Sequence, residues 1–248
     1  MGREQGARPL RTRRGFLNSA AVAGAGVTAA SVMATTGIGT VADLAEAAGG
    51  PVAGGPVEDV AAIVNLIATA ETLAVTFYYT ALTGATFHID ERAVASLAVV
   101  MDAEMGRLDT LRSLGGRSLN DRFYLPDRML SDARVFVDAG LTIEATLAGA
   151  YLAATHQFAA LGRPPLAATA ARHAASAAQH LTLIGHLAGL APHDVARPAP
   201  AFRRVADAAP ALTPFLTKSA GYSELARIPS ARQYRAALGD IMVERARL

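Results

Sequence analysis

Four ionisable residues interrupt long apolar stretches of this 248-residue chain: Glu71, Glu104, Glu144 and His180. Each lies on the apolar stripe near the middle of a predicted helix. Burying a carboxylate without a partner costs several kcal/mol. Four such interruptions at matching depth therefore indicate one shared polar site inside the fold. Carboxylates and an imidazole together are suitable ligands for iron or manganese, so these four residues are candidate metal ligands.

The helices that must position these residues are predicted from the apolar periodicity. Apolar side chains recur at alternating steps of four and three, which predicts helices over about 58–83, 90–114, 133–161 and 166–189. A further helix over about 230–246 is expected to pack on the outside. Alanine is abundant and aromatic residues make up only 6% of the chain, which also favours helices over strands.

The lengths of the connections predict how these helices are arranged. The first and second helices, and likewise the third and fourth, are joined by short links, so each pair should form an antiparallel hairpin. The connection over about 115–132 could span roughly 59 Å when extended. A helix of about 24 residues is only about 36 Å long. The second and third helices can therefore run parallel, and the predicted fold class is an all-α four-helix bundle with one long crossover and an additional C-terminal helix.

The body of the chain, about 58–190, resembles the exported ferritin-like domain family, relatives of ferritin and of the di-iron carboxylate proteins. That family holds two metals with one Glu on each of two helices and a Glu-x-x-His on each of the other two. The resemblance implies that Glu71 and Glu144 match the single glutamates. It also implies that Glu104 matches the Glu of the first Glu-x-x-His and that His180 matches the His of the second.

Two positions depart from this pattern, and they leave the metal content open. Arg107 stands where the first His is expected, and Ala177 stands where the second Glu is expected. If Arg107 points inward, it can pair with the buried glutamates in a metal-free charge cluster, because a guanidinium binds two carboxylates through its fork of donors. If Arg107 snorkels outward, the four remaining ligands could hold one metal. A two-metal site is the third possibility, and the metal-free cluster is favoured.

Other polar side chains near these stripes have simpler interpretations. Tyr78 and Tyr151 are expected in the core with their hydroxyls reaching the carboxylates. His173 is interpreted as a core histidine that is hydrogen-bonded across the bundle. His156 and His186 are predicted to lie on the surface.

The N-terminus resembles a twin-arginine export signal. Residues 12–17 read TRRGFL with the arginine pair Arg13 and Arg14, and a weakly apolar run follows over about 19–33. The AEA at residues 45–47 has the Ala-x-Ala pattern of a cleavage site, so cleavage is expected after Ala47. This resemblance implies that residues 1–47 engage the twin-arginine export machinery. The protein would then be periplasmic or extracellular, or membrane-associated if the signal is retained. Residues 48–57 are predicted to be a linker, and no other segment is expected to be apolar enough to cross a bilayer.

Composition excludes several other functions. The chain has no cysteine, which excludes disulfides and thiolate metal sites. Residues 1–47 hold five of the 23 basic residues and three of the 21 acidic ones, which leaves 18 of each sign in the remainder. Because that remainder is neutral, no nucleic-acid partner is expected despite the sequence pI of about 9.2.

These observations lead to one hypothesis and one alternative. The hypothesis is an exported ferritin-like bundle, over 58–190 with an extension over 191–248, whose di-iron site has degenerated. It would have a non-catalytic structural or interaction role in the cell envelope, as a homo-oligomer or with an envelope protein partner. The alternative is an iron- or manganese-dependent oxidoreductase that oxidises Fe(II) or disposes of peroxide with the surviving ligands.

Overall fold

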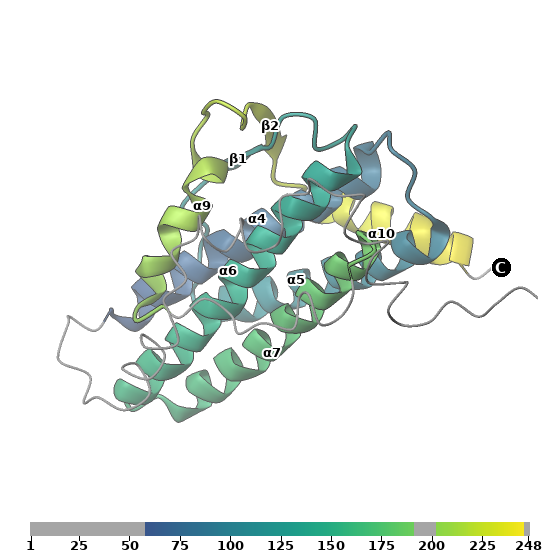
Figure 1. Cartoon of the computed structure of the whole chain (residues 1–248). Coiled ribbons are helices and arrows are strands. Elements are labelled where there is room, and N and C mark those ends of the chain that lie inside the picture. The colour runs from purple at the N-terminus through teal and green to yellow at the C-terminus, as the bar shows by residue number, and fades with distance from the viewer. Residues whose placement is uncertain (1–57, 191–201, 246–248) are drawn as a thin grey trace, which may run out of the picture.

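The computed structural model describes residues 58–190 and 202–245, so the predicted signal and linker lie outside the described residues. Four long helices dominate it (Figure 1): α4 (Val60–Gly84), α5 (Glu91–Ser113), α6 (Ala133–Ala160) and α7 (Pro164–Leu187). Each lies within two residues of its predicted range at both ends. The mostly helical fold therefore agrees with the predicted all-α class.

Local sequence explains where the helices begin and end. Asp59, Asp90 and Asp132 precede α4, α5 and α6, and each side chain accepts hydrogen bonds from backbone amides of the first turn. Such an N-cap contributes about 1 kcal/mol. Gly115 and Gly162 follow α5 and α6 with φ values of 85° and 67°. A left-handed backbone of this kind suits glycine because it has no Cβ, so both helices stop there.

The connection between α5 and α6 runs along α4. Near its start, the backbone N–H of Arg117 donates to Asn65 Oδ1 at 2.9 Å, beside the first turns of α4. Near its end, the N–H of Thr86 donates to the carbonyl of Leu130 at 2.7 Å, just beyond the last turn of α4. Helices α5 and α6 therefore both start at the C-terminal end of α4 and run in the same direction, as the length of the connection predicted.

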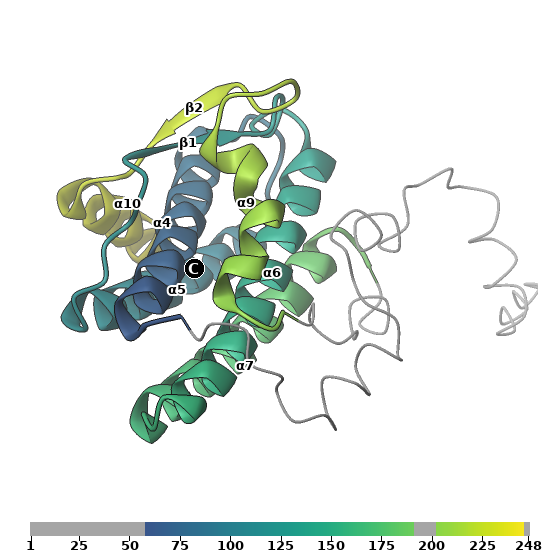
Figure 2. The same ribbon diagram turned by 90° about the vertical axis from the view of Figure 1, so that its left-hand side faces the viewer.

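A small sheet was not predicted from the sequence. Strand β1 (Arg122–Leu125) in this connection pairs antiparallel with β2 (Glu224–Arg227), and Phe123 lies opposite Ala226. The Phe123 side chain is fully buried. The sheet thus attaches both the connection and the C-terminal part of the chain to the helices, and Figure 2 shows the two strands side by side next to α4 and α9.

The C-terminal part adds short helices to the outside of the four long ones. The 3-10 helix η1 (Val205–Ala208) leads into α9 (Ala209–Leu216), and the backbone N–H of Val205 donates to both Glu58 and Gln157. The predicted final helix is present as α10 (Ala231–Arg245). It packs on α5, where the Tyr234 hydroxyl donates to Asp102 at 2.9 Å.

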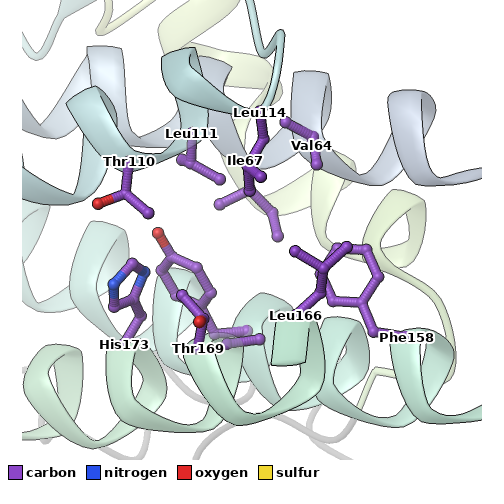
Figure 3. Close-up of a pocket in the computed structure, with 11 residues that line it drawn as sticks. Val64, Ile67, Thr110, Leu111, Leu114, Phe158, Leu166, Thr169 and His173 are labelled. Atoms are coloured by element: carbon purple, nitrogen blue, oxygen red, sulfur yellow. The ribbon is translucent and has the colours of Figure 1, made fainter. Parts of the chain in front are cut away.

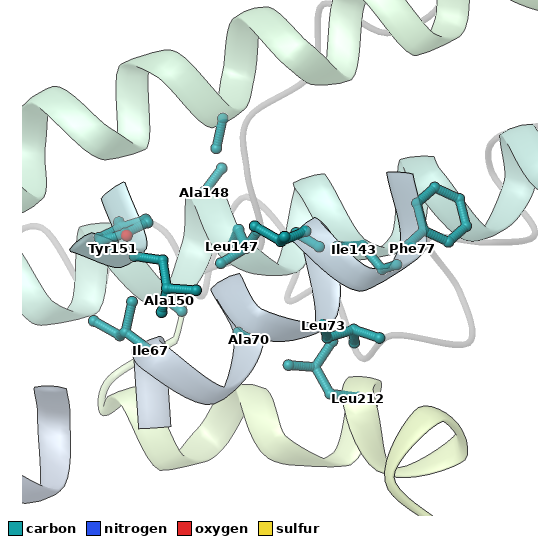
Figure 4. Packing of buried hydrophobic residues seen from close by; sticks show 14 of the residues in the cluster. Ile67, Ala70, Leu73, Phe77, Ile143, Leu147, Ala148, Ala150, Tyr151 and Leu212 are labelled. Carbon is teal, nitrogen blue, oxygen red and sulfur yellow. The ribbon is translucent and has the colours of Figure 1, made fainter. Parts of the chain in front are cut away.

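Helices α4 and α6 supply much of the apolar core. Figure 4 shows Leu73 and Phe77 of α4 beside Ile143 and Leu147 of α6. Both helices are long and apolar enough to cross a membrane by length and composition, contrary to the expectation from the sequence. In each helix, however, 72% of the most apolar 18-residue stretch is buried inside the protein. They are therefore packed as core helices of this fold.

Candidate functional site

Each of the four long helices contributes one of the predicted site residues to the interior. Glu71 comes from α4, Glu104 from α5, Glu144 from α6 and His180 from α7. The three glutamates are fully buried, and His180 is 8% exposed. We call these four residues, together with Arg107, the buried cluster. The helical spacing that predicted an inward position for each side chain is the reason that they meet.

Arg107 points into the buried cluster and joins three helices. Its Nε donates to Glu71 Oε1 at 2.8 Å, and its Nη2 forms an ion pair with Glu104 Oε2. Its Nη1 donates to Ser176 Oγ on α7 at 2.8 Å. The prediction left open whether this side chain points inward or outward, and the structure has it inward with only 5% of the side chain exposed.

His180 closes the other side of the cluster. Its Nδ1 lies 2.6 Å from Glu104 Oε1 and 3.7 Å from Glu144 Oε1. Glu104 therefore lies between two basic groups, the guanidinium of Arg107 and the imidazole of His180. Each of its oxygens therefore lies next to a basic group, although the second oxygens of all three glutamates have no hydrogen-bond partner among the described residues.

Two tyrosines hydrogen-bond to the carboxylates, as predicted. The Tyr78 hydroxyl donates to Glu144 Oε1 at 2.6 Å, and the Tyr151 hydroxyl donates to Glu71 Oε1. Both rings are buried among the helices. Because Glu71 Oε1 accepts from Tyr151 and from Arg107, that oxygen is already committed to protein donors.

Burial and the neighbouring charges shift the pKa values of several cluster residues. Burial, and next the neighbouring Glu104, raise the pKa of Glu71 well above its usual range. Burial lowers the pKa of His180, but the hydrogen bonds to Glu104 and Glu144 outweigh it and raise the value to about 9. Burial also lowers the pKa of Arg107, yet Glu71 and Glu104 raise it by more, so it stays charged. Two cationic side chains, Arg107 and His180, therefore lie among the three carboxyl groups of the cluster.

Three of these residues could hold a metal ion. One ligand atom each from Glu104, Glu144 and His180 lies within 4.8 Å of the other two. A pair of metals does not fit the residues present, because Arg107 extends to the carboxylates and the buried Ala177 supplies no ligand. Glu71 lies outside this group of three. The role of the four residues as metal ligands stays a prediction.

Two features of the site were missed or misread in the sequence. Ser176, which binds Arg107, was not singled out, although it is a polar residue in an alanine-rich helix one position before Ala177. His173 was expected to hydrogen-bond across the bundle. Its Nδ1 is buried, but it has no hydrogen-bond partner in the described part of the chain, and its ring packs edge-on against Tyr151 with centroids 5.1 Å apart. His156 and His186 are exposed, as predicted.

No protein-family model matches this chain, and no curated protein matches it either.

Proposed function

We propose that this protein is an exported, ferritin-like helical bundle in which an arginine has taken the place of metal. Its buried cluster would be a structural element that fixes the four helices in register. The protein would then act in the cell envelope as a structural or interaction protein, as a homo-oligomer or with an envelope protein partner. No nucleic-acid partner is proposed, because the chain after residue 47 is neutral.

The observation that carries this proposal is the inward position of Arg107. Its guanidinium touches Glu71 and Glu104, two of the four candidate ligands, and supplies the positive charge that a metal ion would otherwise provide. A fixed cation within a few ångströms also repels a divalent ion, and that repulsion is strong where water is excluded. Glu71 and Glu104 thereby have a counter-charge without metal.

One observation favours a second candidate function. The convergence of Glu104, Glu144 and His180 could hold a single iron or manganese ion, which would support redox chemistry on oxygen or peroxide. The bound ion would supply a redox-active centre with an open coordination position. Glu104 already binds Arg107 and His180, so a metal would have to displace contacts that the protein makes by itself.

Metal titration of a repaired site tests the proposal. The double variant Arg107→His with Ala177→Glu removes the internal cation and restores both missing ligands. We expect wild-type protein to take up no Fe(II) or Mn(II) under anaerobic conditions, whereas the double variant binds either ion. Arg112→His with Ala178→Glu is the matched control, since it makes the same changes on exposed positions of α5 and α7. Equal metal binding by wild type and the double variant would contradict the proposal.

The export half of the proposal has its own test. Replacing Arg13 and Arg14 by lysine keeps the charge but removes the arginine pair, so the variant should accumulate inside the cell. The protein recovered from the envelope fraction should begin after Ala47, as determined by its mass and N-terminal sequence. Export that persists unchanged in the lysine variant would show that the arginine pair is not an export signal.

A further inference from the structure

A small cavity lies between α4, α5, α6 and α7, next to the buried cluster. Its volume is about 20 Å³. Most of its wall is apolar, but four lining residues carry polar atoms: Thr110, Tyr151, Thr169 and His173. Figure 3 shows Thr110 and His173 on one side of it, with Phe158 and Leu166 on the other. Tyr151 belongs both to this wall and to the cluster, because its hydroxyl donates to Glu71.

The cavity adjoins a polar atom that the protein leaves unpaired. His173 Nδ1 is buried, and no hydrogen-bond partner for it exists among residues 58–190 and 202–245. Burial lowers the pKa of His173, so the ring is neutral at pH 7 and one of its nitrogens needs a donor. An unsatisfied buried group of this kind costs about 1–3 kcal/mol. A bound partner in the adjoining cavity would remove that cost.

We propose that this cavity binds one water molecule, held by His173 Nδ1 and the Tyr151 hydroxyl oxygen, and that solvent reaches the buried cluster from this side. A cavity holds a water when it offers at least about 10–15 Å³ and two to four polar partners. The cavity meets the first condition. The Tyr151 hydroxyl donates a hydrogen bond to Glu71, but its oxygen can still accept a hydrogen bond from the water.

The size of the cavity decides between water and other ligands. An engineered cavity that binds benzene measures about 150 Å³, so a space of about 20 Å³ excludes aromatic or lipid-like ligands. The hydroxyls of the two lining threonines donate to backbone carbonyls of their own helices, Thr110 to Gly106 and Thr169 to Pro165. Their oxygens can still accept hydrogen bonds from water. The bound water would thus connect bulk solvent, Tyr151 and Glu71.

A high-resolution crystal structure of the full chain is the direct test. We expect one water peak in the cavity, within about 3 Å of His173 Nδ1. An empty cavity, or a His173 ring that has turned to bond another protein atom, would overturn the proposal.

Proton exchange provides a second test. The exchange of the Tyr151 hydroxyl proton with solvent can be followed by NMR. Ala170→Val adds two methyl groups to the cavity wall and should slow this exchange several-fold. Ala167→Val adds the same groups at another buried position of α7 that does not line the cavity, and it should leave the rate unchanged. His173→Phe, which removes the polar partner, should also slow exchange if the valine variant does not fold.

Unchanged exchange in both cavity variants would contradict the proposal. The water site does not depend on the metal content of the cluster. Metal bound at Glu104, Glu144 and His180 would refute the proposed function while leaving the water at His173 in place.

Discussion

Helix α5 carries two acid–base pairs of the same spacing in opposite environments. Glu104 and Arg107 are 0% and 5% exposed, whereas Asp109 and Arg112, one turn further along, are 65% and 49% exposed. Both pairs are an acid followed by an arginine three residues later. The local pattern alone therefore does not decide what such a pair does.

The surroundings make the difference between these pairs. Arg107 also binds Glu71 of α4 and Ser176 of α7, so three helices depend on it. Arg112 binds Asp109 and contacts the sulfur of Met105, all within its own helix. An exposed pair contributes about 0–1 kcal/mol. Breaking a buried pair costs about 3–5 kcal/mol, because a charge is left uncompensated. The two pairs should therefore respond very differently to the same substitution.

The largest effect is expected for Arg107→Met against Arg112→Met. Loss of Arg107 leaves Glu71 without its cation and Glu104 with His180 alone, so the free energy of unfolding should fall by about 3–5 kcal/mol. The Arg112 variant should stay within about 0.5 kcal/mol of wild type. Denaturant unfolding near pH 7 measures both. Similar small losses in the two variants would mean that the buried pair is no more important than the surface one.

The next effect is a pH dependence that His180 confers and exposed histidines do not. The pKa of His180 is about 9 in the folded protein, above the usual value of about 6.5. The protonated form is thus favoured by folding. Protonated His180 should therefore contribute about 3 kcal/mol to the free energy of unfolding. This contribution should be fully present below pH 6.5 and should disappear as the pH rises through 9.

Stability measured from pH 6 to 10 tests this dependence. His180→Gln should flatten the decline, while His186→Gln, at an exposed position of the same helix, should reproduce the wild-type curve. A wild-type curve that is flat over this range would show that His180 is not held as an imidazolium by Glu104 and Glu144.

The smallest effect separates two tyrosine–carboxylate hydrogen bonds. Tyr78 donates to the fully buried Glu144, and Tyr234 donates to the exposed Asp102. Tyr78→Phe should cost about 1.5–3 kcal/mol, because it leaves a buried charge-assisted bond unmade. Tyr234→Phe should cost only about 0.5–1.5 kcal/mol. Thermal unfolding of the two variants measures both costs. A larger loss of stability in Tyr234→Phe than in Tyr78→Phe would contradict this expectation.

The helices and the depth of the site could be predicted from the sequence because both follow from periodicity. An apolar stripe with a period near 3.6 predicts a helix, and a glutamate on that stripe is buried wherever the helix packs. Glu71 and Glu144 were predicted in this way. The length of the connection after α5 likewise limited the directions in which the chain could return.

The remaining features depend on contacts between distant segments. Strands β1 and β2 have four residues each and lie about a hundred residues apart, so neither contains a recognisable alternation. The sequence favoured an inward Arg107 but could not decide its direction, because a long side chain near a helix face can turn inward or outward. Glu71 of α4 and Ser176 of α7 fix it inward, and local sequence shows neither.

The measurement that tests the central claim most directly is the metal content of the mature wild-type protein. The protein should be isolated from the envelope fraction without chelator and analysed before and after anaerobic loading with Fe(II). Because Arg107 already supplies a cation to Glu71 and Glu104, we predict no stoichiometric iron or manganese in either sample. One or two metal ions per chain would contradict this and show that the cluster is a working metal centre.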